Sequence, residues 1–335
     1  MIKINNNIKF YTFIDIMSTY SDDNISISIK EINNHMNNRI GTTIDRRTMY
    51  SYIKDMKALG LEVSSYNEET GGYSFINHKL EDYEIRILVD AILSSKFITK
   101  KKTIELIDKL IKLNSIYLSN DLNRKVFVDD RSKSINEEIF INIDKLNTAI
   151  RNKKQVSFNY YDYNYNKVLT PRLNSDNELK TYTVTPITMI LKNENYYLVL
   201  ADKKHNDLSN YRVDRMKNIE ILDEESRCLS EINDCKKGFN AATYSKKSFK
   251  MFPGDEHIVE IQFKKSLLNF MIDEFGCDID IVENEDKTYN GKFIAKVGQG
   301  LVRWILQLGK DAIVISPENL KQEIKNELLE ISKLY

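Results

Sequence analysis

The sequence predicts an α+β protein made of several modules, in which helices come first and antiparallel strands follow. Apolar residues recur at helical spacing in residues 10–56 and again in residues 80–148, and β-branched and aromatic residues cluster in short runs through residues 155–222. Strand and helix patterns alternate after His257. With 335 residues, the chain is long enough for two or three domains. Basic and acidic residues balance at 49 each, so no overall field attracts the chain to nucleic acid or to a membrane.

Residues 1–78 are predicted to form three helices followed by a hairpin. Ser28 and Glu31 match a capping box at the start of the second helix. Asp45 can cap a third helix, which Gly60 ends. Two short strands then flank a turn at residues 68–72. This order of elements is that of a winged helix-turn-helix domain.

The third helix of this domain is predicted to have one polar face. At about 100° per residue, polar residues gather opposite Met49 and on the flank: Arg46, Arg47, Tyr50, Ser51 and Lys54. One interpretation is that this charged face only contacts water, and the alternative is that it contacts DNA. Residues 1–76 hold eight basic and nine acidic residues, which is a poor balance for a DNA-binding domain. DNA binding would then depend on this local face and on dimer avidity.

Residues 79–148 are predicted to be a helical connector. One apolar stripe covers residues 85–93 and another covers residues 106–111, and the basic run at residues 100–102 between them suits a solvated loop or a helix start. Such stripes exceed what a small module can bury, and closed two-fold dimers are the commonest way to cover them. We therefore expect a homodimer.

Residues 149–223 are predicted to form a small, strongly bent antiparallel barrel. Val156, Phe158 and Tyr160 alternate with polar residues, so this strand has one buried face and one wetted face. The polar residues 192–195 can join two paired strands as a hairpin. Residues 145–222 hold 13 basic and 8 acidic residues, so the barrel is the basic part of a neutral protein.

The last third of the chain is predicted to be a linker and a second α+β module. Residues 224–255 are polar and suit a linker with one short helix. Residues 256–335 show strand and helix patterns in the order βαββαβ, which is that of a ferredoxin-like unit, followed by a last helix that starts at Pro317. Ser266 is expected to cap the first helix of this unit.

The barrel segment resembles the WYL domain of bacterial transcription regulators, a small barrel related in shape to Sm and SH3 folds. The resemblance is carried by four features: Tyr160, Pro186, Tyr196-Tyr197-Leu198 and Arg212-Val213-Asp214-Arg215-Met216. Three positions depart from the family pattern, because this chain has Tyr196 for the usual Trp, Tyr211 for the usual Phe and Thr185 where His is common. The first two replacements keep an aromatic ring.

The resemblance extends to the modules on both sides of the barrel. The start of the third helix is similar to the recognition helix of these regulators, and Gly71-Gly72-Tyr73 is similar to their wing. The C-terminal module looks like the extension that often follows WYL domains, with matches at residues 301–304, 308–309 and 316–318. The candidates for DNA contact that follow are Arg46, Arg47, Thr48, Tyr50, Ser51, Lys54, Gly71, Gly72 and Tyr73.

The resemblance also implies a barrel that binds an anionic effector, with single-stranded DNA, RNA or a nucleotide as the leading candidate. The candidate effector residues are Tyr160, Tyr196, Tyr197, Arg212 and Arg215. In an extended strand Arg212 and Asp214 would share one face and Arg215 would point to the other. The competing interpretation of this pair is a strand end held together by salt bridges between Asp214 and the arginines.

The sequence contains no constellation typical of an enzyme or of a cofactor or metal site. The four histidines lie in different predicted elements, and no nucleophile-elbow, zinc-protease or phosphate-loop motif occurs. Three widely spaced cysteines predict neither a disulfide framework nor a zinc site. The first residues lack the apolar core of a signal peptide, and no apolar run approaches a membrane span, so a cytoplasmic location without membrane contact is expected.

Two functions are compatible with these patterns. The first is a homodimeric transcription regulator that binds a double-stranded DNA operator and senses an anionic effector through its barrel. The second is an accessory protein that binds nucleic acid or a nucleotide and modulates a defence or repair enzyme by protein contacts. The near-neutral charge of the N-terminal module keeps the second possibility open.

Overall fold

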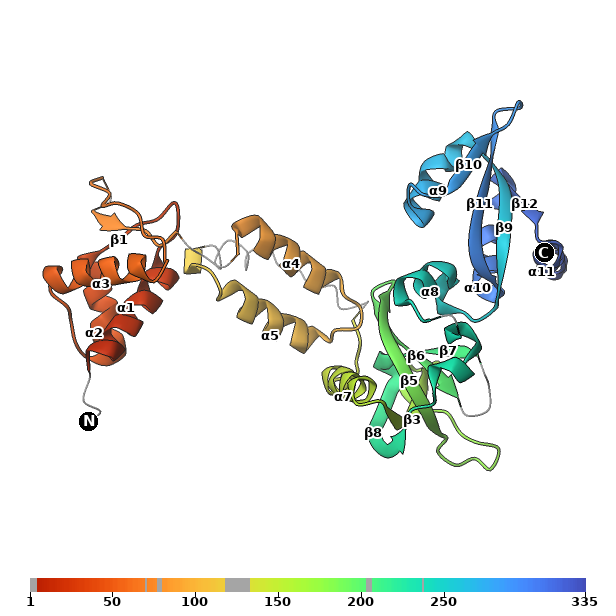
Figure 1. Cartoon of the computed structure of the whole chain (residues 1–335), viewed down its shortest axis with the longest axis horizontal. Coiled ribbons are helices and arrows are strands. Elements are labelled where there is room, and N and C mark those ends of the chain that lie inside the picture. The colour runs from red at the N-terminus through yellow and green to blue at the C-terminus, as the bar shows by residue number, and fades with distance from the viewer. Residues whose placement is uncertain (1–4, 70, 77–79, 118–132, 203–206, 237) are drawn as a thin grey trace. The chain divides into compact units, whose positions relative to one another are not determined.

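The computed structural model describes residues 5–69, 71–76, 80–117, 133–202, 207–236 and 238–335. These fall into two compact units, residues 1–135 and 136–335, which are described separately. The first unit is mainly helical and the second contains two larger antiparallel sheets with helices around them (Figure 1). The coarse prediction of an α+β protein is confirmed.

The first unit begins with three helices that enclose one core. The helices are α1 (Asn6–Tyr20), α2 (Ile29–Ile40) and α3 (Arg46–Ala58), and two short strands accompany them, β1 (Ile27–Ser28) and β2 (Gly72–Tyr73). Phe13, Ile32 and Met56 are fully buried between the helices. Both predicted caps are confirmed, because Ser28 and Glu31 form a capping box and the Asp45 side chain accepts from the Thr48 amide at 2.7 Å.

The hairpin after α3 is held by a short strand that the sequence did not reveal. Gly72 and Tyr73 pair with Ser28 and Ile27 of β1, and an isolated bridge joins Val63 to Phe75. A Cβ at Gly72 would lie 2.4 Å from the carbonyl oxygen of Ile27. The close approach of β1 therefore requires glycine at this position.

Two helices follow in the first unit, α4 (Asp82–Ser94) and α5 (Lys100–Ile111). Ile85, Val89, Ile107 and Ile111 are buried in a small core that these helices share. Thr99 caps α5, so the basic run begins a helix. Residues 118–132 of the predicted connector lie outside the described residues.

The second unit begins with α7 (Ile139–Arg151) and a strongly curved sheet. Its strands are β3 (Lys154–Tyr163), β4 (Leu169–Pro171), β5 (Thr181–Lys192), β6 (Asn195–Asp202), β7 (Leu208–Arg212) and β8 (Met216–Glu225). The strand order is β4-β3-β5-β6-β7, and β8 pairs with β3. The predicted hairpin between β5 and β6 is confirmed, and Asn193 and Glu194 both have positive φ, as a two-residue turn of this kind requires.

The segment after β8 contains the short helix that the sequence predicted, α8 (Ala241–Lys247), together with several 3₁₀ turns. It differs from a polar linker in the burial of its apolar residues. Ile232, Cys235, Tyr244 and Met251 are buried against residues of β5, β6 and β7. These few apolar residues have irregular spacing, so no periodic pattern marked them as part of a core.

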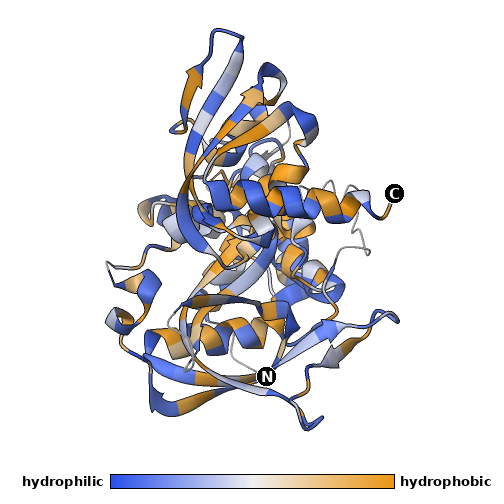
Figure 2. Ribbon diagram, turned by 90° about the vertical axis from the view of Figure 1, so that its right-hand side faces the viewer, coloured by the Kyte–Doolittle hydropathy of each residue, from blue (hydrophilic) through white to orange (hydrophobic). Residues whose placement is uncertain are grey.

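The C-terminal part is a four-stranded antiparallel sheet with helices. Its elements are β9 (Asp255–Lys264), α9 (Leu268–Phe275), β10 (Asp280–Glu283), β11 (Thr288–Val297), α10 (Gln299–Leu306), β12 (Ala312–Ser316) and α11 (Glu318–Ser332). The strand order is β10-β11-β9-β12. The expected cap at Ser266 is wrong, because this residue lies in a 3₁₀ turn ahead of α9 and that helix has no side-chain cap. Hydrophobic and hydrophilic residues alternate along the helix that ends at the C-terminus (Figure 2).

Candidate functional sites

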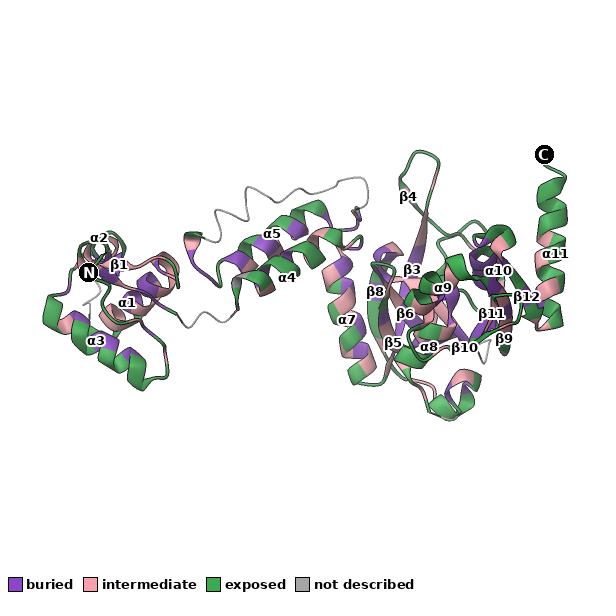
Figure 3. Cartoon of the chain, turned by 90° about the horizontal axis from the view of Figure 1, so that it is seen from above, coloured by how far each residue is buried: buried purple, intermediate pink, exposed green. Residues whose placement is uncertain are grey.

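Helix α3 exposes the polar face that the sequence predicted. Its core side carries Met49, Tyr52, Ile53 and Met56, which are buried. The opposite side is exposed (Figure 3) and carries Arg46, Arg47, Tyr50, Ser51 and Lys54. Thr48 is half-buried and its amide bonds to Asp45. The helix therefore presents three cationic side chains at its N-terminal end and middle.

The wing residues lie against this helix. Burial, followed by the neighbouring Tyr50, raises the pKa of Tyr73, and Arg46 acts in the opposite direction. The Tyr66 and Tyr73 rings meet edge to face at 5.4 Å. Gly71 has a φ of +70° and its amide donates to the Asn67 carbonyl at 2.8 Å. The fold thus brings the start of α3 and Tyr73 together, while Gly71 and the buried Gly72 shape the wing.

Arg212, at the end of β7, is held by a buried carboxylate. Its Nε and Nη2 donate to the two Asp214 carboxylate oxygens at 3.0 and 2.9 Å, and Nη2 also donates to the Asn195 side-chain oxygen at 2.7 Å. The side chain of Asp214 is 3% exposed and that of Arg212 is 27% exposed. Burial opposes the charge, but the ion pair with Asp214 outweighs it and raises the pKa of Arg212. The Nη1 group forms no hydrogen bond with the described residues, so this end of the guanidinium can serve a ligand.

The geometry around Arg215 differs from the extended strand that the sequence suggested. Strand β7 ends at Arg212, and Val213–Arg215 form a 3₁₀ turn. Arg215 lies 3.4 Å from the Asp162 carboxylate through Nη1, and its buried Nε has no hydrogen-bond partner. An unpaired buried donor costs about 1 to 3 kcal/mol. Because of this turn, side chains do not alternate between two faces as they would in an extended strand. Arg212 and Arg215 pair with different carboxylates.

Asp162 joins Arg215 to a second arginine that sequence analysis missed. Arg172 donates to Asp162 through Nε at 2.6 Å and through Nη2 at 3.3 Å. This hydrogen bonding raises the pKa of Arg172, while burial acts against it. Two arginines therefore share one carboxylate, which leaves a net positive charge beside β3.

Four cationic side chains of the barrel lie over tyrosine rings. Arg172 is 4.7 Å from the Tyr160 ring centre and Lys180 is 4.8 Å from that of Tyr182. Lys217 is 5.2 Å from Tyr161 and Arg215 is 5.9 Å from Tyr163. Such pairs combine positive charge with flat aromatic surface, which is the chemistry that nucleic acid bases and phosphates require.

The structure brings together most of the predicted effector residues. Tyr197 is the cross-strand partner of Arg212, and the hydroxyl of the buried Tyr160 accepts from the Arg212 amide at 3.2 Å. Tyr196 is the exception, because adjacent residues of a strand face opposite sides and Tyr196 therefore points away from Tyr197. Tyr160 supports the site from within the core.

Three polar residues of this cluster were missed by sequence analysis: Asp162, Arg172 and Asn195. Asp162 precedes its partner Arg215 by 53 residues, so no local spacing could reveal the pair. Asn195 was read only as part of a polar turn, although it is buried beside Arg212.

Two family models match the second unit. The WYL domain model matches residues 142–221. This part of the chain is a WYL domain. The WCX domain model matches residues 255–332, which covers the four-stranded sheet and α11.

The WYL-domain protein is also similar to longer stretches of other proteins. It is 21% identical over 299 residues to the "Uncharacterized HTH-type transcriptional regulator YobV" of Bacillus subtilis (strain 168), which covers 86% of this chain and 89% of the relative. Proteasome accessory factor B/C (PafBC) of Arthrobacter aurescens is 14% identical, with a TM-score of 0.28, over 95% of this chain and 47% of that one. The chain thus spans about half the length of PafBC. A crystal structure titled as a CRISPR Cas-related protein is 14% identical, with a TM-score of 0.36, over 77% of this chain and 75% of that one.

The described residues contain no group of three or more His, Cys, Asp or Glu side chains placed to hold a metal ion. No described helix is both long and apolar enough to cross a membrane.

Proposed function

We propose that this WYL-domain protein is a DNA-binding transcription regulator. The observation that carries the proposal is the exposed face of α3, where Arg46, Arg47 and Lys54 project from a helix whose other side is fixed in a core. The similarity to a protein named as an HTH-type transcriptional regulator supports the same role. The WYL and WCX matches suit a regulatory protein rather than an enzyme.

The proposed DNA contact follows from the orientation of α3. Residues 1–78 act as a winged helix-turn-helix domain, and the N-terminal end of α3 enters the major groove. Arg47 reads a guanine edge with its paired donors, while Arg46, Thr48, Ser51 and Lys54 hold phosphates and Tyr50 packs beside them. The wing, with Gly71, Gly72 and Tyr73, lies along the neighbouring backbone.

The proposed regulator is a homodimer. Helices α4 and α5 leave apolar side chains in solvent, with Tyr83 at 65% and Ile87 at 62% exposure. These two residues are one helical turn apart and form a stripe that a second copy can cover. Two copies double the phosphate contacts, which offsets the near-neutral charge of residues 1–76.

The proposed effector is an anion that binds the barrel, with single-stranded DNA, RNA or a nucleotide as its chemical class. The Nη1 group of Arg212 and the partly exposed Nη1 end of Arg215, which pairs with the exposed Asp162, supply donors for phosphate. Tyr161 and Tyr163 supply rings on which a base can stack. The WCX segment is proposed to be ferredoxin-like and the WYL segment Sm-like.

The barrel contacts suggest how the effector rearranges the site. Asp214 is buried, so it holds Arg212 in place. Asp162 is 43% exposed, so a phosphate can displace it from Arg172 and Arg215. Release of Asp162 changes the contact between β3 and β4, and the first effect of the ligand is expected there.

Titration with labelled oligothymidine and with nucleotides tests the effector site. Arg215→Ala should weaken binding by about 1.5 to 3 kcal/mol, as for a lost hydrogen bond to a charged group. Arg212→Lys keeps the charge near Asp214 but loses the paired donors, so it should weaken binding while leaving the fold intact. Arg151→Ala, at the exposed end of α7, removes one charge outside the site and serves as the control. Unchanged affinity in both site variants, each checked by thermal melting, would place the effector elsewhere.

An accessory role for an enzyme of a defence or repair pathway is the second candidate. The feature that favours it is the charge balance of residues 1–76, with eight basic and nine acidic residues. Such a protein would use the barrel for nucleic acid but would occupy no promoter sites. Its chromosomal distribution therefore separates the two functions.

A further inference from the structure

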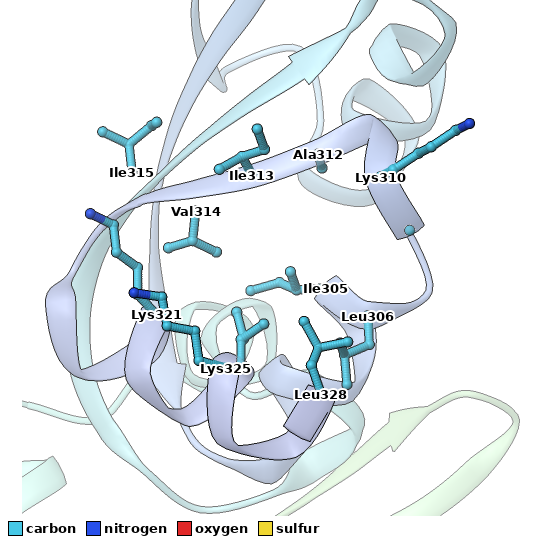
Figure 4. Close-up of a pocket in the computed structure, with 12 residues that line it drawn as sticks. Ile305, Leu306, Lys310, Ala312, Ile313, Val314, Ile315, Lys321, Lys325 and Leu328 are labelled. Carbon is cyan, nitrogen blue, oxygen red and sulfur yellow. The ribbon is translucent and has the colours of Figure 1, made fainter. Parts of the chain in front are cut away.

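An apolar groove lies between β12 and α11 in the C-terminal part. Figure 4 shows the strand as one wall and the helix as the other, with Val314 and Leu328 between them. The groove encloses about 760 Å³. Its apolar lining includes Ile305, Leu306, Ala312, Val314, Ile324 and Leu328. The residues that line the groove lie far in sequence from Arg212 and Arg215, and they form no part of the proposed effector site.

One wall of the groove is an open sheet edge. Strand β12 is the last strand in the order β10-β11-β9-β12, and among the described strands it pairs only with β9. Its outer edge therefore presents backbone N–H and C=O groups that a further strand can pair with. The side chains of Ile313 and Ile315 beside this edge are 60% and 39% exposed. Both the backbone and the side chains of β12 are thus available to an added strand.

Three lysines mark the ends of the groove. Lys321 and Lys325 extend from α11 toward the Ile315 end of β12, whereas Lys310 stands at the opposite end and points outward (Figure 4). Lys321 lies 3.1 Å from Glu318, which is an exposed carboxylate. Within the described part of the chain, Lys310 and Lys325 form no ion pair. The positive charge at the Ile315 end is therefore only partly compensated.

We propose that this groove binds an extended peptide segment of a partner protein, which adds as a strand to β12. Alternate apolar side chains of the peptide would enter the groove beside Val314 and Leu328. Acidic residues at one end of the peptide would face Lys321 and Lys325. Strand addition of this kind combines backbone hydrogen bonds for affinity with side-chain pockets for specificity.

The open strand edge favours a peptide over a small amphiphile. A fatty acid could fill the apolar lining and pair its carboxylate with a lysine. It could not pair with the row of backbone groups along β12, which a peptide backbone satisfies. The lysines in turn favour an acidic segment over a basic one.

Selection from a phage-displayed library of random octapeptides on the full-length protein tests the proposal. Selected peptides should alternate apolar residues and carry acidic residues at one end. Their synthetic, fluorescein-labelled forms should bind the protein in anisotropy titrations. The double variant Lys321→Glu/Lys325→Glu should weaken this binding by roughly tenfold, because two attractive exposed pairs become repulsive. N-methylation of alternate backbone amides in the peptide should abolish binding.

Control variants and control ligands can overturn the proposal. Lys333→Glu changes the same charge on the helix cap beyond the groove and should leave peptide binding unchanged. If no peptides are enriched, the proposal is overturned. It is also overturned if enriched peptides bind the double variant as tightly as they bind the wild type. If the wild type binds decanoate but no peptide, and the double variant does not bind decanoate, the groove is an amphiphile site instead. If Ile313→Asp changes the oligomeric state of the protein when no peptide is present, the groove is an interface between copies of this chain.

Discussion

Arg212 and Asp214 are paired by two hydrogen bonds across the 3₁₀ turn between β7 and β8. Arg212 Nε and Nη2 lie 3.0 and 2.9 Å from the two carboxylate oxygens of Asp214. The pair forms because the chain enters a 3₁₀ turn at Val213, which brings the two side chains to one side. The buried carboxylate fixes the orientation of the guanidinium, whose Nη1 group forms no hydrogen bond with the described residues.

Removal of the Asp214 carboxylate should destabilise the second unit. Asp214→Ala leaves the Arg212 charge half-buried without its partner, and we expect a loss of about 2 kcal/mol, below the 3 to 5 kcal/mol typical of fully buried pairs because Arg212 is partly exposed. Urea unfolding followed by the fluorescence of Trp304, the single tryptophan of the chain, measures this loss. A double-mutant cycle with Arg212→Ala should give a coupling of about 1 kcal/mol or more. Additive effects would show that the pair contributes no stability.

The first unit should lose stability as the pH falls below neutrality. The His35 ring stacks on Tyr20 with ring centres 3.7 Å apart, and burial, followed by the nearby Arg39, lowers the pKa of His35 from its usual 6.5. The unfolded chain therefore binds a proton at a higher pH than the folded chain does, and this contribution to stability is lost as the pH falls below about 6.5 toward the folded pKa. Urea unfolding by circular dichroism at pH 7.5 and 5.5 measures the loss. His35→Gln should reduce the difference between the two pH values, and an unchanged difference would contradict this role of His35.

Local signals in the sequence predicted much of the fold. Ser28, Glu31 and Asp45 lie within three residues of the backbone groups that they cap, so their role depends on neighbours in the chain. The hairpin at Asn193-Glu194 is likewise set by a short polar tip between two strands. Features of this kind can be read without knowledge of the tertiary structure.

Features that depend on distant parts of the chain were missed. Strand β1 is only Ile27–Ser28 and exists because the wing pairs with it. Asp162 and Arg172 belong to the effector cluster only because β3 and β4 form a hairpin beside Arg215. The exposed apolar stripe of the first unit is also shifted from the prediction, since Ile85 and Val89 are buried between α4 and α5 whereas Ile87 is exposed. Ile87 lies two residues from both Ile85 and Val89, which places it on the opposite side of the helix at about 100° per residue.

The N-terminal end of α3 should control the affinity for duplex DNA. Arg47→Ala should weaken binding to a specific site by about 1 to 3 kcal/mol for a lost base contact. Lys54→Ala should weaken binding to all sequences and reduce the salt dependence by about one phosphate contact. Anisotropy titrations over a range of salt concentrations separate these effects, with Lys57→Ala at the far end of α3 as the control. Equal losses for Arg47→Ala on specific and random duplexes would show that Arg47 holds phosphate and reads no base.

The exposed stripe on α4 should hold two copies of the chain together. Ile87→Glu places a charge on the proposed apolar contact, and light scattering at micromolar concentration should then report a monomer in place of a dimer. Lys109→Glu, a charge change in the last turn of α5, serves as the control. A wild-type protein that is monomeric under these conditions would remove the avidity on which the DNA proposal depends.

Genomic footprinting of the full-length protein tests the central claim most directly. The wild-type protein should protect discrete promoter sites with two-fold symmetric half-sites, because each copy presents one α3. The Arg47→Ala protein, expressed to the same level, should lose these sites while remaining folded. A wild-type protein that occupies no discrete promoter sites, or an Arg47→Ala protein with the same footprint, would contradict the assignment of α3 as the DNA-reading helix of a transcription regulator.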